Sequence, residues 1–168
     1  LARIDRSREL RVADIGCGTG ASTLVLADEL PGRITAVDLF EPFLEKLVAR
    51  VEGEPPADKI ETLVCSMDDL PWQEESFDLI WSEGAIYNIG FESGVLDWRR
   101  FLKPRGVLAV SEITWLTDER PGELEEYWHA EYPEIATASV KLGQLERAGY
   151  TPLGHFVIPR ECWTEHFY

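Results

Sequence analysis

Short apolar runs that alternate with helix-forming stretches are the feature that most constrains how this chain folds. The expected elements take turns along the sequence, with strands at 11–15, 33–37, 60–65, 77–82 and 106–113 and helices at 21–30, 41–51 and 91–102. The run at 77–82 has an almost unbroken apolar centre, which is typical of a strand buried on both faces of a parallel sheet. Right-handed crossovers between such elements predict a doubly wound, Rossmann-like α/β fold. In such sheets ligands bind beyond the carboxyl ends of the strands.

The last third of the chain changes character. Residues 118–131 are acidic and aromatic and predict a helix on an added surface segment. Another helix is expected at 139–148, because Gly149 suits a left-handed cap at its end. Residues 151–158 and 162–168 are interpreted as two closing strands of the same sheet. With 168 residues, the chain is expected to form one domain, residues 1–168.

Composition and charge exclude several classes of function. Lys and Arg number 16 against 31 Asp and Glu, so the formal net charge is −15. Such a surface repels nucleic-acid phosphates and anionic lipids, and no apolar run reaches the roughly 18 residues of a spanning helix. Cys17, Cys65 and Cys162 are widely spaced, which predicts neither a disulfide scaffold nor a metal site. Reduced cysteines and an opening without a signal peptide favour a cytoplasmic location.

A glycine-rich loop follows the first expected strand and opens the first helix. Gly16, Gly18 and Gly20 let the backbone turn tightly and let a ligand approach closely. The helix N-terminus behind them favours an anionic group of that ligand. Asp38 ends the second strand, 22 positions after Gly16, where a carboxylate would accept hydrogen bonds from ribose hydroxyls. These features fit either NAD or S-adenosylmethionine (SAM).

Asp14 separates the two cofactors. A carboxylate two residues before the first glycine repels a pyrophosphate but attracts a ligand with an ammonium or sulfonium group. SAM carries both cations, together with a carboxylate for the helix N-terminus. The sequence therefore favours SAM, with an NAD-dependent oxidoreductase as the alternative. A SAM-binding module without catalytic activity is a further alternative.

At this point several segments resemble the motifs of class I SAM-dependent methyltransferases, in the UbiE/COQ5-like small-molecule branch. The matching segments follow in the family's order, at residues 12–20, 36–38, 65–72, 76–82 and 102–108. Residues 81–90 are also similar to a set of uncharacterised bacterial methyltransferases. The resemblance implies a seven-stranded sheet with an antiparallel last strand and a segment at 114–136 inserted on the acceptor side. It also implies N-terminal lid helices, which are expected to be missing from this sequence.

The resemblance also implies a cofactor site. Its expected residues are carried over one by one from the matching motifs: Asp14, Gly16, Gly18, Asp38, Leu39, Ser66, Met67, Asp68, Ser82 and Glu83. The first three would line the methionine moiety, and Ser82 and Glu83 would face its amino-acid end. Asp38 would hold both ribose hydroxyls, while Leu39 and Met67 would contact the adenine. Ser66 stands where the family often has Asp for the adenine amino group. The product would be S-adenosylhomocysteine.

Methyl transfer is an in-line displacement at a sulfonium carbon, so alignment supplies most of the acceleration. A base is needed only where the acceptor carries a proton. Glu112, at the end of the fifth strand, is the candidate for orienting or deprotonating the acceptor, and Tyr87 is the second catalytic candidate. An ordinary hydrogen-bonded carboxylate is the alternative for Glu112. Tyr87, Asn88 and Trp115 are expected to line the pocket of a small-molecule acceptor. The acceptor and the oligomeric state stay open, with a homodimer among the options.

Overall fold

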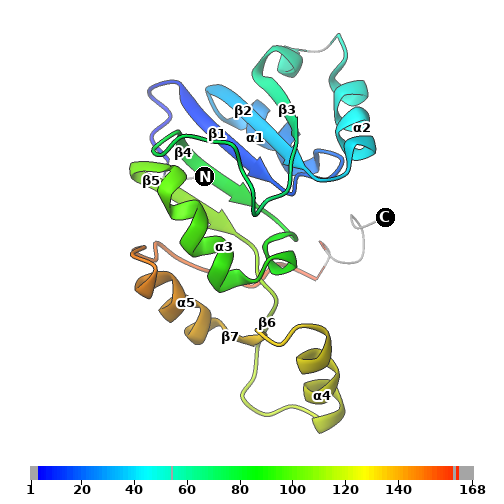
Figure 1. The fold of residues 1–168 in the computed structure, drawn as a ribbon, viewed down its shortest axis with the longest axis vertical. Coiled ribbons are helices and arrows are strands. Elements are labelled where there is room, and N and C mark those ends of the chain that lie inside the picture. Colours follow the sequence, from blue (N-terminus) through cyan, green and yellow to red (C-terminus); the bar gives the residue numbers. More distant parts are fainter. Residues whose placement is uncertain (1–3, 54, 161, 163–168) are drawn as a thin grey trace.

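The computed structural model describes residues 4–53, 55–160 and 162. Its centre is a parallel sheet of five strands in the order β3-β2-β1-β4-β5 (Figure 1). The strands are β1 (Leu10–Ile15), β2 (Gly32–Asp38), β3 (Ile60–Val64), β4 (Phe77–Ser82) and β5 (Leu102–Val110). The strand order reverses between β1 and β4, and this reversal places the ligand crevice of a doubly wound sheet beyond their carboxyl ends.

Helices cover both faces of this sheet (Figure 1). The crossover helices are α1 (Ala21–Glu29), α2 (Glu41–Val51) and α3 (Phe91–Trp98), while α5 (Ala138–Arg147) follows β5 and packs beside α3. Alternating side chains of β1 point into two hydrophobic cores on opposite faces of the sheet. Val12 packs with Leu26 of α1 in one core, and Ala13 packs with Val95 of α3 in the other. Three 3-10 helices complete the domain: η1 (Pro55–Lys59), η2 (Ile86–Asn88) and η3 (Arg99–Phe101).

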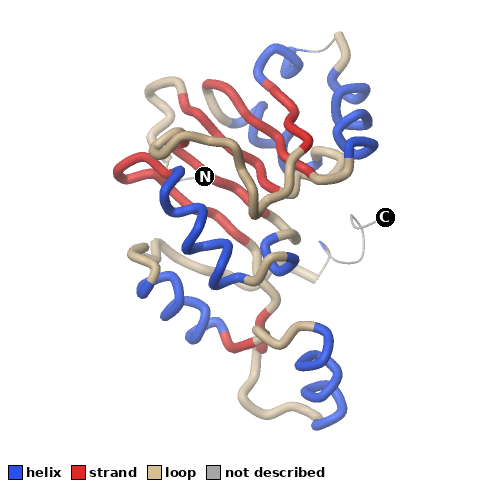
Figure 2. Tube along the Cα trace, viewed as in Figure 1, coloured by secondary structure: helices blue, strands red, loops and turns tan. Residues whose placement is uncertain are grey.

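The connection from β3 to β4, residues 65–76, is a loop without a helix (Figure 2). The helix expected at 91–102 ends at Trp98, and β5 begins at Leu102. A 3-10 turn at Arg99–Phe101 follows α3, and Pro104 disfavours helical conformation at Lys103, which lies in β5. Leu102 then pairs with Phe77, and the β4–β5 ladder resumes at Leu79 after an irregularity.

A small unit lies beyond β5, away from the central sheet (Figure 1). It holds the parallel pair β6 (Thr114–Trp115) and β7 (Ala136–Thr137), with α4 (Gly122–Glu131) between them. The helix expected within 118–131 is confirmed. Gly149 follows α5 with a φ of 85°, as its expected role as a left-handed cap requires.

The doubly wound α/β class is confirmed, but the first of the two expected closing strands, at 151–158, is not formed. The central sheet has five strands among the described residues instead of seven, and no strand is assigned within 151–158. Residues 162–168, apart from Cys162, lie outside the described residues. Along 151–158 no backbone hydrogen bond joins the segment to β5, and the side chain of Phe156 is 82% exposed. A strand needs both a hydrogen-bonded ladder and a packed face, and this segment has neither.

No helix in the described part of the chain is long and apolar enough to cross a membrane.

Candidate cofactor and acceptor site

The glycine loop is built by backbone hydrogen bonds between the ends of β1 and β2. The amides of Gly16 and Cys17 both donate to the carbonyl of Val37, at 2.8 and 3.0 Å. The loop glycines Gly16, Gly18 and Gly20 all have positive φ, the region that favours glycine. A Cβ at Gly16 would lie 2.3 Å from that of Ala85, whereas a Cβ at Gly18 would meet nothing within 4 Å. Gly18 therefore borders open space, where a ligand can approach the backbone.

Asp38 lies directly beside this loop. Its Oδ2 accepts a hydrogen bond of 2.8 Å from the amide of Gly18, and its Oδ1 accepts one of 2.9 Å from the amide of Phe40. Each oxygen has a further lone pair, so the carboxylate can also accept hydrogen bonds from two hydroxyl groups. Leu39 lies between Asp38 and Phe40 in the sequence, and its exposed side chain is at the same edge of the sheet. This arrangement fits a ribose and an adjacent planar base.

Asp14 is buried under the loop, with 1% of its surface exposed. Its Oδ2 accepts a hydrogen bond of 2.6 Å from Thr23 Oγ1 on α1. Burial raises the pKa of Asp14 to about 7, and the nearby charges of Glu83 and Asp38 act in the same direction. The sequence did not single out Thr23, although its place in the first turn of α1 points it back toward the strand end.

The loop after β3 reaches the glycine loop through Met67. The Cε of Met67 lies 3.3 Å from the position that a Cβ of Gly16 would take, and the carbonyl of Met67 accepts a hydrogen bond from Trp98 Nε1. Ser66 and Asp68 are joined by a short side-chain hydrogen bond. The chain places these three predicted residues next to the loop and at the same edge of the sheet.

The residues after β4 have different orientations. Ser82 is buried and donates a hydrogen bond of 2.9 Å to the carbonyl of Ile15, so it joins β4 to β1. Glu83 is exposed and accepts a hydrogen bond of 2.8 Å from Ser22 Oγ. Asn88 uses its side-chain amide to cap the carbonyl of Ala85, 2.9 Å away. Tyr87 is partly exposed, and its ring centroid lies 6.3 Å from that of Tyr132.

Glu112 follows β5 and is engaged by two residues that sequence reasoning missed. Its Oε1 lies 2.7 Å from Lys141 Nζ and accepts a hydrogen bond of 2.6 Å from Tyr132 Oη. Burial raises the pKa of Glu112, while the hydrogen bonds from Lys141 and Tyr132 oppose that rise. Trp115 is half-buried, and its Nε1 has no hydrogen-bond partner among the described residues. Nothing in the sequence around Lys141, which lies within a helix, could have predicted that it pairs with Glu112.

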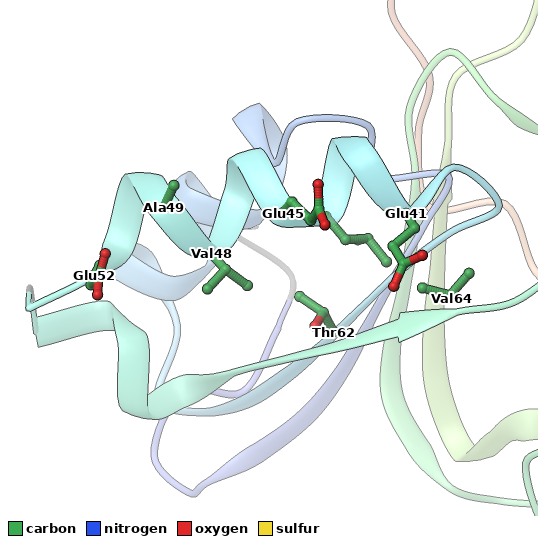
Figure 3. A pocket seen from close by; sticks show the side chains of 8 residues that line it. Glu41, Glu45, Val48, Ala49, Glu52, Thr62 and Val64 are labelled. Atoms are coloured by element: carbon green, nitrogen blue, oxygen red, sulfur yellow. The ribbon is translucent and has the colours of Figure 1, made fainter.

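The structure has two grooves that do not include the central residues of the candidate cofactor site. The larger, about 360 Å³, lies between α2 and β3, and three glutamates and an apolar wall line it (Figure 3). The smaller, about 240 Å³, lies beside the first turn of α1 and includes Ser22, Trp81 and Glu83. Neither groove is lined by Asp14, Asp38 or a loop glycine. Within the described part of the chain, no cluster of three or more His, Cys, Asp or Glu side chains could hold a metal ion.

The predicted residues therefore gather at one edge of the sheet, in the loops after β1, β2, β3, β4 and β5. A glycine loop after β1 and a carboxylate after β2, at the reversal of the strand order, define an α/β domain that binds a nucleoside-containing cofactor. A methyltransferase domain model matches residues 13–110, more than half of the chain. The chain belongs to this family of SAM-dependent methyltransferases, and its fold is that of the class I enzymes.

Curated relatives differ in the acceptors that their names give. The chain is similar to the erythromycin 3''-O-methyltransferase of Saccharopolyspora erythraea, with 34% identity over 66% of this chain and 37% of the relative. It is also similar to the demethylmenaquinone methyltransferase of Lactiplantibacillus plantarum, with 30% identity over 68% of this chain and 49% of the relative. The chain spans at most about half the length of these relatives.

Solved structures share the fold at low sequence identity. The cyclase SpnF superposes with a TM-score of 0.74 at 22% identity, covering 91% of this chain and 55% of that one. The geranyl diphosphate C-methyltransferase of Streptomyces coelicolor, solved with S-adenosylhomocysteine, gives a TM-score of 0.71 at 18% identity, covering 87% of this chain and 55% of that one. Because the first of these proteins is a cyclase, the fold also carries other chemistry.

Proposed function

We propose that this chain binds SAM at the carboxyl edge of its sheet and transfers the methyl group to a small-molecule acceptor. One observation carries the choice of cofactor: Asp14 is buried at the same edge as Asp38 and Glu83, and burial, with the charges of Glu83 and Asp38 adding to it, raises the pKa of Asp14 to about 7. Such a site gains from a cation, because a nearby positive charge favours the ionised carboxylate. SAM brings an ammonium and a sulfonium, whereas the pyrophosphate of NAD would add negative charge.

The proposal assigns a cofactor contact to each of the predicted residues. Gly18 offers backbone beside open space for the methionine moiety, and the tightly packed turn at Gly16 and the charge of the buried Asp14 lie next to it. Asp38 takes the ribose hydroxyls, and Leu39 and Met67 contact the adenine. Ser66 and Asp68 lie near the edge of that base. Glu83 faces the amino group, while Ser82 holds β4 against β1.

The acceptor belongs on the far side of the methyl group from the glycine loop. SAM supplies an electrophilic methyl group on a good leaving group, so the protein has to align the acceptor and exclude water. Tyr87, Asn88 and Trp115 line this side in the proposal, and Glu112 receives a proton where the acceptor carries one. Residues 114–136, which include β6 and α4, form the inserted acceptor-side segment of the single domain.

We infer a cytoplasmic location and a small-molecule partner, with neither nucleic acid nor membrane as partner. Cys17, Cys65 and Cys162 are free in the structure, which suits a reducing compartment. The net charge of −15 disfavours binding to phosphate backbones and anionic lipids. A homodimer stays an open option.

Calorimetric titration with SAM, S-adenosylhomocysteine and NAD tests the cofactor. We expect SAM and S-adenosylhomocysteine to bind, and Asp38→Asn to weaken both by about tenfold or more, because two charge-assisted hydrogen bonds to ribose become neutral ones. Asp28→Asn on the exposed side of α1 is the matched control and should leave both affinities unchanged. Tight NAD binding without SAM binding would replace the proposal with the oxidoreductase. SAM binding without methyl transfer to any acceptor would leave a SAM-binding module.

A further inference from the structure

Glu112 lies at the centre of a buried charged cluster beyond the end of β5. The side chains of Glu112 and Lys141 are 6% and 4% exposed, and their Oε1 and Nζ atoms lie 2.7 Å apart. Tyr132 Oη lies 2.6 Å from the same Oε1 and 3.3 Å from Lys141 Nζ. Burial, and then the hydrogen bond to Glu112, raise the pKa of Tyr132, so its phenol donates to the carboxylate.

Separate elements converge on this cluster. Lys141 comes from α5, Tyr132 follows α4, and Phe91 begins α3. Lys141 Nζ lies 4.8 Å from the ring centroid of Phe91 and 5.1 Å from that of Tyr132. A lysine is rarely so buried unless it is paired, and placing an ion pair in an apolar setting costs desolvation energy. Apolar side chains of similar size would fill this space at lower cost, so a role beyond packing is indicated.

The cluster is incomplete in two ways. Glu112 Oε2 is buried and has no hydrogen-bond partner among the described residues, although Oε1 has two donors. Glu134 Oε2 lies 4.0 Å from Lys141 Nζ, so two carboxylates share one ammonium and leave one negative charge in excess. Buried polar atoms in native proteins are almost always hydrogen-bonded, and exceptions concentrate where a ligand or a catalytic step uses them. A donor for Oε2 is therefore missing.

The position of the cluster connects it to the cofactor edge. Ser111, the neighbour of Glu112, donates its amide to the carbonyl of Ser82 and accepts a hydrogen bond of 2.7 Å from the amide of Gly84. The ring of Tyr132 contacts that of Tyr87 in the following turn. Ala85 of the same turn packs on Gly16. These contacts join the residue that carries the unpaired oxygen to the loops at the cofactor edge.

We propose that Glu112 Oε2 recognises the acceptor, and that the acceptor is protic: it presents an O–H or N–H group at the atom to be methylated. This inference rests on the proposed function. During transfer the acceptor's O–H or N–H bond breaks and its proton moves to Oε2. A new bond to the methyl carbon forms, and the carbon–sulfur bond breaks with its electron pair left on sulfur. The proton then leaves Glu112 for solvent.

Lys141 and Tyr132 are positioning residues in this arrangement. They occupy Oε1, so only Oε2 is left for the acceptor, and the charge of Lys141 favours the ionised carboxylate that accepts the proton. A thioether or a neutral tertiary amine offers no proton to Oε2, so the proposal predicts that neither is methylated by this chain.

The test measures S-adenosylhomocysteine formation at pH 8 with protic and aprotic aromatic probes. Phenol, benzyl alcohol and aniline are the protic probes, and N,N-dimethylaniline and thioanisole are the aprotic ones. We expect turnover with protic probes alone. Glu112→Gln should lower kcat/KM by about 100-fold or more, as the loss of a general base does. The Kd of SAM should stay within about twofold, since this residue is placed outside the cofactor site.

Lys141→Met and Tyr132→Phe distinguish positioning from a purely structural role. Without Lys141 the pKa of Glu112 rises, so the acidic limb of kcat/KM should move to higher pH. Tyr132→Phe removes one hydroxyl and gives a second reading if Lys141→Met fails to fold. Glu61→Gln, in the exposed pair with Arg33, is the control and should change neither rate nor pH profile.

Three outcomes would overturn the inference: turnover of either aprotic probe, SAM binding without turnover of any probe, or unchanged kcat/KM in Glu112→Gln. An unmoved acidic limb in both positioning variants would remove Lys141 and Tyr132 from the proposal. Failure of the wild-type protein to bind SAM would instead refute the proposed function itself, so the two failures are distinguishable.

Discussion

At the scale of single residues, Asp14 has competing effects on folding and on cofactor binding. Its pKa of about 7 is raised above the unfolded value by burial, so the unfolded chain loses its proton first and stability falls as pH rises from about 4 to 7. Asn at position 14 keeps an oxygen for the hydroxyl of Thr23 and removes the buried charge. We expect Asp14→Asn to raise the free energy of unfolding at pH 8 by about 1–3 kcal/mol, measured by urea denaturation.

The same carboxylate makes SAM binding depend on pH. A cationic ligand favours the ionised form of Asp14, so its pKa should fall in the complex and SAM should bind more tightly as pH rises toward 7. Calorimetry in buffers of different ionisation enthalpy should show proton release at pH 6 to 7. Proton release of the same size in Asp14→Asn would assign the linkage to another group.

A substitution at Gly18 should affect folding little and ligand binding strongly. It has a φ of 54°, and a Cβ there would meet no protein atom within 4 Å. Gly18→Ala should cost only about 1–2 kcal/mol of left-handed backbone strain, yet its methyl group would occupy the space proposed for the methionine moiety. Gly53→Ala is the matched control, because it has a φ of 79° and open surroundings far from the site. Equal SAM affinities of the two variants would contradict the placement of the cofactor.

At the scale of elements, Asp78 ties the start of β1 to β4 and β5. It accepts hydrogen bonds from the Arg8 side chain at 2.7 Å, the Arg11 amide at 2.8 Å and Lys103 at 2.8 Å. Burial opposes its ionisation, but these three partners outweigh burial and lower the pKa of Asp78 to about 2. Because the folded pKa lies below the unfolded one, this stabilisation is full above about pH 4 and is lost as pH falls through 2.

Asp78→Asn should therefore destabilise the protein at pH 7 by about 2 kcal/mol or more. The difference from the wild type should shrink as the pH is lowered from 4 toward 2, as measured by chemical denaturation at each pH. Asp97→Asn on the exposed side of α3 controls for a general loss of charge. A difference that stays constant across this pH range would mean that the carboxylate charge contributes nothing.

The elements also show where sequence reasoning succeeds. The apolar run of β4 and the glycines after β1 are local signals, so they predict both the sheet and its loop. Residues 151–158 carry strand-like apolar residues, but pairing depends on distant partners, and the segment forms no ladder in the structure. Lys141 shows the same difficulty at the site. Lys141 and Glu112 are 29 positions apart in the sequence, so no local pattern predicts their contact. Glu112 itself was predicted because it follows a strand.

At the scale of the whole molecule, the net charge of −15 acts on every carboxylate at once. Glu41, Glu45 and Glu52 line the groove between α2 and β3, and none of the residues that line it is basic (Figure 3). Self-repulsion of this kind destabilises the compact state and is screened within about 10 Å at 0.1 M salt. Stability and cofactor binding should therefore respond to salt in opposite directions, because SAM is attracted by the same field.

Raising KCl from 0.05 to 0.5 M should increase the melting temperature by a few degrees and weaken SAM binding by about two- to fivefold. Glu45→Gln with Glu52→Gln should reproduce part of the thermal gain at low salt and leave the Kd of SAM unchanged, because the groove lies away from the glycine loop. Differential scanning calorimetry and titration with SAM measure the two effects. Salt that lowers the melting temperature, or binding that salt does not weaken, would show that local pairs outweigh the overall field.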